Sequence, residues 1–140
     1  MLQLTKTLIS EGCHVSVING GKTRDDIIFI NDLKTLKNDE LLFTTEDGSY
    51  CRKGLVIDAL HYLLEKNVFD MIYACGSESM INKIFNISEK YSVKLQACME
   101  RVIRCSIGLC GSCLIGEYRV CKNGLVLSSE QLREVKDELD

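Results

Sequence analysis

The sequence predicts an α/β protein with an open, mainly parallel sheet, flanking helices and a small cysteine-rich lobe at the C-terminal end. Helical and β-type segments alternate from residue 1 to about residue 97, which is the pattern of a parallel sheet with helices on its faces. After that point glycine and cysteine crowd together and the alternation stops. We therefore expect a nucleotide-binding type of domain over residues 1–97 and a metal-binding lobe over residues 98–140.

The first half of the chain predicts three helices and two strands. Apolar spacing predicts a helix over about the first ten residues, and the Asn-Gly-Gly turn follows a β-rich run at 13–18. A capped helix is expected over 26–36, a strand over 41–45 and an amphipathic helix over 54–66.

The second half predicts a strand, a helix and another strand before the pattern changes. The strand DMIYAC at 70–75 is followed by a helix that Ser77 can cap and that runs to about Tyr91, and then by a strand at 93–97. Further on, we expect two short strands and a last turn of helix capped by Ser128 or Ser129. These two strands lie at 115–120 and 125–127.

Composition and charge exclude several classes of function. The net charge is −3 and no basic stripe is present, so we expect no binding to nucleic acid. No apolar run reaches the roughly 18 residues that a membrane span needs. The N-terminal segment lacks the pattern of a signal peptide. These observations predict a cytoplasmic protein that is not embedded in a membrane.

Four of the eight cysteines form the spacing C-x4-C-x2-C-x7-C, and they are Cys105, Cys110, Cys113 and Cys121. Disulfides are disfavoured because the cytosol keeps thiols reduced. Zinc favours two separate C-x2-C pairs or nearby histidines, whereas C-x4-C-x2-C with a distant fourth cysteine is the plant-ferredoxin type of [2Fe–2S] spacing. The spacing therefore favours a [2Fe–2S] cluster, with zinc and a redox thiol pair as alternatives.

The remaining cysteines predict less specific roles. Cys75 ends a predicted parallel strand and precedes Gly76 and Ser77, and ligands of open α/β sheets bind at such strand ends. A strand-to-helix turn with a buried thiol explains the same residues equally well. Cys13 and Cys98 are expected in the core, because free cysteine is among the most buried residue types.

Four motifs in order resemble the electron-transfer subunit of dihydroorotate dehydrogenase, within the ferredoxin–NADP reductase superfamily. They are NGGKT, TTEDGS followed by KG, IYACGSESM, and the C-terminal segment in which MER precedes CSIGLCGSC and RVCKNG follows it. The similarity covers nearly the whole chain, and the cysteine loop is its most specific part.

The resemblance implies an electron relay. Electrons would pass between an FAD and NAD(H) reductase module, a [2Fe–2S] cluster and the flavin of a partner catalytic subunit, linking dihydroorotate oxidation in pyrimidine biosynthesis to NAD. It implies that the cluster is ligated by Cys105, Cys110, Cys113 and Cys121. It further implies that Cys75 and Gly76 border the nicotinamide and flavin, and that Asp47, Gly48 and Ser49 line the nucleotide side.

The chain also departs from the family. Ser77 replaces a proline, and the FAD-binding barrel, the first strand of the nucleotide domain and a G-x-G-x-x-G turn are absent. We expect no FAD binding and no activity by this chain alone. A parent chain or a homo-oligomer is expected to supply the missing central strand, or the remaining strands close up in a changed order. Alternatives are the related subunit of a hydrogenase, sulfide dehydrogenase or ferredoxin:NADP oxidoreductase, and a zinc-stabilised, non-enzymatic interaction module.

Overall fold

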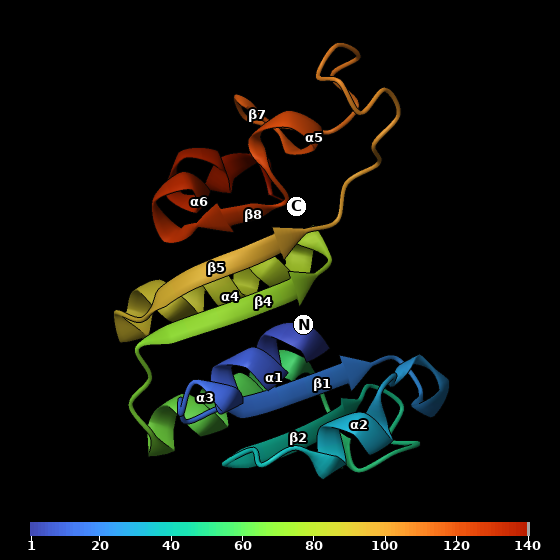
Figure 1. Ribbon diagram of the computed structural model, residues 1–140, viewed down its shortest axis with the longest axis vertical. Helices are drawn as coiled ribbons and strands as arrows, with labels where there is room; N and C mark the ends of the chain where they lie inside the picture. The colour runs from blue at the N-terminus through green and yellow to red at the C-terminus, as the bar shows by residue number, and fades with distance from the viewer. Residues whose placement is uncertain (140) are drawn as a thin grey trace. The chain divides into compact units, whose positions relative to one another are not determined.

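The structure is a computed structural model that describes residues 1–139, and the chain divides into two compact units (Figure 1). The first unit is Met1–Lys66 and the second begins at Asn67. Each unit contains a three-stranded sheet with helices beside it. The predicted α/β class with mainly parallel strands is confirmed.

The first unit builds its sheet entirely from parallel strands, in the order β1-β2-β3. A small core of Ile27, Leu33 and Phe43 holds its elements together. The elements are α1 (Leu2–Ser10), β1 (Ser16–Gly21), the 3-10 helix η1 (Arg24–Asp26), α2 (Ile30–Thr35), β2 (Glu40–Thr45), β3 (Arg52–Lys53) and α3 (Val56–Lys66).

The helix predicted over 26–36 begins only at Ile30. A capping box between Thr23 and Asp26 closes η1 instead. The Asn19 Nδ2 group then donates to the Ile28 carbonyl at 2.8 Å, and Phe29 adopts a left-handed conformation with φ 58°. The helix prediction was therefore too long at its start. The apolar spacing continues through this segment, but the contact from Asn19 in β1 holds the backbone there in a non-helical conformation.

The first predicted strand also begins later, at Ser16, and the prediction that Cys13 lies in the core is wrong. Cys13 is exposed. Gly12, with φ 81°, turns the chain at the end of α1. The Cys13 N–H donates to the Leu8 carbonyl at 3.0 Å, so Cys13 belongs to the helix terminus.

The second unit has a mixed sheet in the order β4-β5-β8, with β5 parallel to β4 and β8 antiparallel to β5. The long helix α4 packs against β4 and β5. The elements are β4 (Met71–Gly76), α4 (Glu78–Tyr91), β5 (Lys94–Met99), β6 (Leu114–Ile115), β7 (Tyr118–Arg119), α5 (Val120–Asn123), β8 (Val126–Ser128), α6 (Ser129–Val135) and the 3-10 helix η2 (Lys136–Glu138).

The single strand predicted over 115–120 is instead a tight hairpin of β6 and β7. Gly116 provides the turn with φ 54°, and its N–H donates to Glu138 Oε2 at 2.8 Å. The expected boundary between residues 97 and 98 falls inside β5, and β8 from the C-terminal part completes the sheet. The division into a nucleotide-binding domain and a cluster lobe stays a prediction.

Within residues 1–139, the two-residue strand β3 and two of the six-residue parallel strands have a neighbour on one side only. The longer two are β1 in the first unit and β4 in the second. Neither strand carries a proline or a charged residue, so neither edge has the usual protection against further pairing. Among residues 1–139, no helix is long and apolar enough to cross a bilayer.

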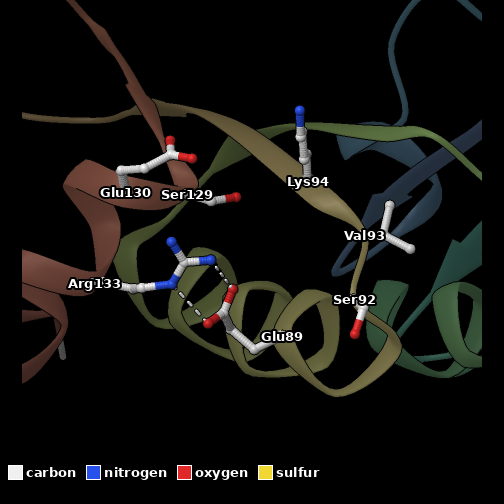
Figure 2. Close-up of a pocket in the computed structure, with 7 residues that line it drawn as sticks. All are labelled: Glu89, Ser92, Val93, Lys94, Ser129, Glu130 and Arg133. Atoms are coloured by element: carbon white, nitrogen blue, oxygen red, sulfur yellow. Dashed lines mark hydrogen bonds and ion pairs between the residues drawn. The ribbon is translucent and has the colours of Figure 1, made fainter.

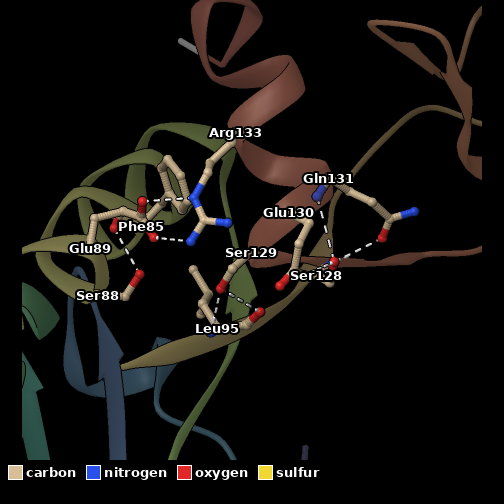
Figure 3. Close-up of polar contacts among 9 residues, drawn as sticks. All are labelled: Phe85, Ser88, Glu89, Leu95, Ser128, Ser129, Glu130, Gln131 and Arg133. Atoms are coloured by element: carbon tan, nitrogen blue, oxygen red, sulfur yellow. Dashed lines mark hydrogen bonds and ion pairs between the residues drawn. The ribbon is translucent and has the colours of Figure 1, made fainter. Parts of the chain in front are cut away.

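Ser129 anchors α6 to the sheet (Figure 3). Its hydroxyl accepts from the Leu95 N–H at 2.7 Å and donates to the Leu95 carbonyl at 3.3 Å. Both residues are buried. Ser128 caps α6 through a capping box with Gln131. The pairing of β5 with β8 ends at Gln96, one residue before Leu95 is reached. The Ser129 hydroxyl therefore takes the place of a backbone partner for Leu95.

Replacing Ser129 with alanine is expected to lower the free energy of unfolding by about 1–3 kcal/mol, because the buried Leu95 N–H loses its acceptor. Urea denaturation of the two proteins measures the change. Ser10→Ala is a matched control, since its exposed hydroxyl only contacts the Thr7 carbonyl. Equal stability of Ser129→Ala and wild type would contradict this role.

A bidentate ion pair at a shallow surface pocket also links α6 to α4 (Figure 2). Arg133 Nε and Nη2 each lie 2.8 Å from a carboxylate oxygen of Glu89. This hydrogen bonding to Arg133 lowers the pKa of Glu89. The pair is solvent-exposed, so it contributes little to stability.

Replacing Arg133 with methionine is expected to raise the pKa of Glu89 towards its ordinary value. Because the folded pKa is lowered, the contribution of the pair is present above the ordinary carboxyl pKa and is lost as the pH falls through the folded value. Carboxyl-carbon NMR titration measures the shift. Lys136→Met serves as the control for removing a positive charge from the same end of the chain, and an unchanged Glu89 pKa in Arg133→Met would contradict the assignment.

Candidate functional site

The four cysteines of the predicted cluster lie in one part of the second unit. Cys105 and Cys110 are in the irregular segment after β5, Cys113 directly precedes β6, and Cys121 lies in α5. Ser106, Gly108 and Gly111 in this loop have positive φ angles. Such backbone turns let successive N–H groups converge on one acceptor.

Cys105 is the acceptor at the centre of the first turn. The Cys110 N–H donates to Cys105 Sγ at 3.5 Å. This hydrogen bond, with those from the backbone N–H groups of Ile107 and Leu109, lowers the pKa of Cys105 to about 6. The loop therefore stabilises a thiolate at Cys105, which is the form that binds metal.

Cys113 and Cys121 form a second pair. The Cys121 N–H donates to Cys113 Sγ at 3.5 Å, and this bond lowers the pKa of the buried Cys113. Hydrogen bonding to Cys113 raises the pKa of Cys121, and the Gly108 N–H opposes this rise. The Gly108 contact connects the second pair to the loop that surrounds Cys105.

The chemistry of these donors fits a thiolate-bound metal centre, and their backbone hydrogen bonds link them as two pairs, Cys105 with Cys110 and Cys113 with Cys121. Among residues 1–139, no three Cys, His, Asp or Glu side chains are gathered closely enough to hold a metal ion. Cys110 Sγ is within 3.4 Å of Ser112 Oγ. The two histidines of the chain, His14 and His61, belong to the first unit.

The predicted nucleotide residues of the first unit form a tight turn after β2. Ser49 donates to Asp47 Oδ1 from its N–H at 2.9 Å and from its hydroxyl at 2.7 Å, which lowers the pKa of Asp47. Ser49 Oγ also accepts from the Arg24 N–H at 2.7 Å. Gly48 has φ 79° at the turn. The arrangement presents an anionic, ordered turn at the carboxyl end of the strand.

The other predicted nucleotide residues end β4 in the second unit. A Cβ added to Gly76 would lie 2.4 Å from Met80 Cε, the flexible end of a side chain in α4. Ser77 caps α4 by accepting from the Met80 N–H. Cys75 is exposed. Partial burial raises its pKa, and the neighbouring Cys98 thiol raises it further.

A family model described as Oxidoreductase NAD-binding domain matches residues 1–85. The chain belongs to this family. Curated relatives include proteins named probable dihydroorotate dehydrogenase B (NAD(+)), electron transfer subunit. The Pyrococcus furiosus protein is 42% identical over 83% of this chain and 45% of its own length. The Methanopyrus kandleri protein is 38% identical over 94% of this chain and 50% of its own.

A comparison with solved structures also supports the reductase-like fold. A chain of the NADH-dependent reduced ferredoxin-NADP oxidoreductase matches with a TM-score of 0.75 and 25% identity, over 97% of this chain and 51% of its own. The expected resemblance to dihydroorotate dehydrogenase electron-transfer subunits and ferredoxin–NADP reductases is thereby confirmed. This NAD-binding family member spans about half the length of the relatives it matches.

Sequence reasoning missed two contacts beside these residues. Arg101 Nε lies 2.8 Å from Glu78 Oε1, which joins the segment after β5 to the first turn of α4. Cys98 is paired in register with Cys75. The spacing of the cysteines gave no signal for this second pair, because register depends on how β4 and β5 align.

Proposed function

We propose that the chain transfers electrons between a nicotinamide nucleotide and flavin module and a partner protein through a [2Fe–2S] cluster. Cys105, Cys110, Cys113 and Cys121 are the ligands. The observation that carries the proposal is the set of backbone N–H groups directed at Cys105 Sγ and Cys113 Sγ. Such donors stabilise negative charge on cluster sulfurs and tune the potential.

The chain's own residues prepare this centre for its ligand. The loop holds Cys105 as a thiolate near neutral pH, and the buried Cys113 anchors the other pair to the β6–β7 hairpin. A [2Fe–2S] cluster bound by the four thiolates would supply one-electron steps between carriers that donate or accept electrons in pairs.

The nucleotide is placed at the carboxyl ends of the parallel strands. Asp47, Gly48 and Ser49 are the proposed nucleotide contacts of the first unit. Cys75 and Gly76 are the proposed contacts of the second unit, each set taken by itself. The match to an NAD-binding family supports this placement, as does the general location of ligands in open α/β sheets. The FAD is assigned to the part of the relatives' length that this chain does not match.

The partner is proposed to be a catalytic flavoprotein, a dihydroorotate dehydrogenase of pyrimidine biosynthesis, acting in the cytoplasm. The names of the relatives support this choice. Exposed apolar side chains around the cluster loop supply a contact surface, since exposed apolar patches often mark interaction sites. They are Val102, Ile103, Ile107, Leu109 and Leu114. The substrate that reduces a co-purified flavoprotein identifies the partner.

Anaerobic purification followed by metal and sulfide analysis tests the cluster. The proposal predicts about two irons and two acid-labile sulfides per chain, with a red-brown colour that dithionite bleaches. One colourless zinc ion per chain would instead support the zinc-stabilised interaction module and would refute electron transfer by this centre.

A further inference from the structure

A second pair of cysteines lies outside the proposed cluster. In the parallel ladder of β4 and β5, Cys75 is in register with Cys98. Residues paired in register extend to the same face of a sheet. Ala74 and Ala97, one position earlier on each strand, are buried and therefore lie on the opposite face. Cys75 and Cys98 are thus neighbours on the less covered face of this sheet.

The separation of the two backbones is compatible with a covalent bond between the thiols. Neighbouring strands lie about 4.8 Å apart, and the Cα atoms of disulfide-bonded cysteines are usually about 4.4–6.8 Å apart. The Cys98 thiol is near enough to contribute to the raised pKa of Cys75. Cys75 is exposed, whereas Cys98 is half-buried, so a soluble reagent reaches Cys75 first.

Contacts on both sides fix the relative position of the two strand ends. Arg101 and Glu78 join the segment after β5 to the start of α4 through an ion pair at 2.8 Å. On the other side of β5, Cys98 is paired with Val126 of β8. The two thiols are therefore held together by the sheet and by the ion pair.

We propose that Cys75 and Cys98 form a dithiol modification site that a low-molecular-weight disulfide, such as oxidised glutathione, converts to an intramolecular disulfide. Cys75 attacks one sulfur of the reagent, the reagent's S–S bond breaks, and one glutathione thiol leaves. Cys98 then attacks Cys75 Sγ and displaces the second glutathione. The two protein thiols lose two electrons and two protons, and the reagent gains them as two thiols.

The environment of Cys75 slows its reaction with such a reagent. Its raised pKa keeps the thiol protonated near neutral pH, and the protonated thiol is the slower nucleophile. The site requires neither a cluster nor a nucleotide, so it stands independently of the proposed electron transfer.

Tryptic peptide mapping of the purified full chain tests the site. Cleavage after Lys66, Lys83, Lys94 and Arg101 places Cys75 in peptide 67–83 and Cys98 in peptide 95–101. After incubation with oxidised glutathione and alkylation of free thiols, mass spectrometry is expected to find these two peptides joined. Dithiothreitol is expected to separate them.

Variants distinguish a dithiol site from two independent thiols. Cys98→Ser is expected to lose the joined peptide completely and to retain glutathione on peptide 67–83. Cys51→Ser, which removes another exposed thiol, is expected to keep the joined peptide. The proposal is overturned if wild type retains glutathione on Cys75 as Cys98→Ser does, or if Cys75 is found joined to any cysteine other than Cys98.

Discussion

Replacing Cys110 with serine is expected to remove the iron–sulfur absorbance and most of the iron and sulfide from the anaerobically purified chain. Cys110 is the exposed member of the first thiol pair, and its N–H donates to Cys105 Sγ. A serine hydroxyl is a much poorer ligand for iron than a thiolate. The visible spectrum and the iron and sulfide content per chain measure the loss.

The matched control is Cys13→Ser, which removes an exposed thiol from the end of α1. This variant is expected to keep the full spectrum and metal content. Cys110→Ser with wild-type absorbance would show that Cys110 is not a ligand. Equal losses in the two variants would show that the metal depends on general thiol content, which would contradict the assignment of the four ligands.

Replacing Gly116 with valine is expected to lower the free energy of unfolding by about 2–4 kcal/mol, through left-handed backbone strain and overpacking. Gly116 has φ 54°, and an added Cβ would lie 2.6 Å from Cγ1 of Val135. Val135 is buried, so it has little room to move. Because the β6–β7 hairpin follows Cys113, the variant is also expected to bind less iron. Urea denaturation measures the stability.

Two further variants separate the two causes. Gly12 has φ 81° with nothing within 4 Å of an added Cβ, so Gly12→Val reports backbone strain alone and is expected to cost less. Adding Val135→Ala to Gly116→Val is expected to recover part of the loss by making space. If the double variant loses more free energy of unfolding than the two single variants lose together, the steric explanation is contradicted.

The sequence predicted most regular elements because their signals are local. The apolar stripe of α3 and the Ser77 cap of α4 depend on residues a few positions apart, and both appear where expected. The helix predicted over 26–36 failed at Phe29, whose left-handed conformation follows a contact from Asn19 to the Ile28 carbonyl. Periodicity carries no information on such a contact between separate elements.

In the candidate site, too, local patterns were predictable from the sequence and contacts between separate elements were not. The spacing of the four cysteines and the motif at Cys75 were visible as patterns in the chain. The backbone N–H groups around Cys105 depend on positive φ angles, one of them at Ser106, and serine gives little signal for that conformation. The pairing of Cys75 with Cys98 depends on the register of β4 and β5. The alternation of side chains along each strand does not determine that register.

Electron paramagnetic resonance of the anaerobically purified, dithionite-reduced full chain tests the central claim most directly. A [2Fe–2S] centre that accepts one electron is expected to give about one unpaired electron for every two irons, and no signal before reduction. The signal is expected to be absent from Cys110→Ser and present in Cys13→Ser. A reduced wild-type sample that is silent and contains one zinc ion per chain would contradict the account.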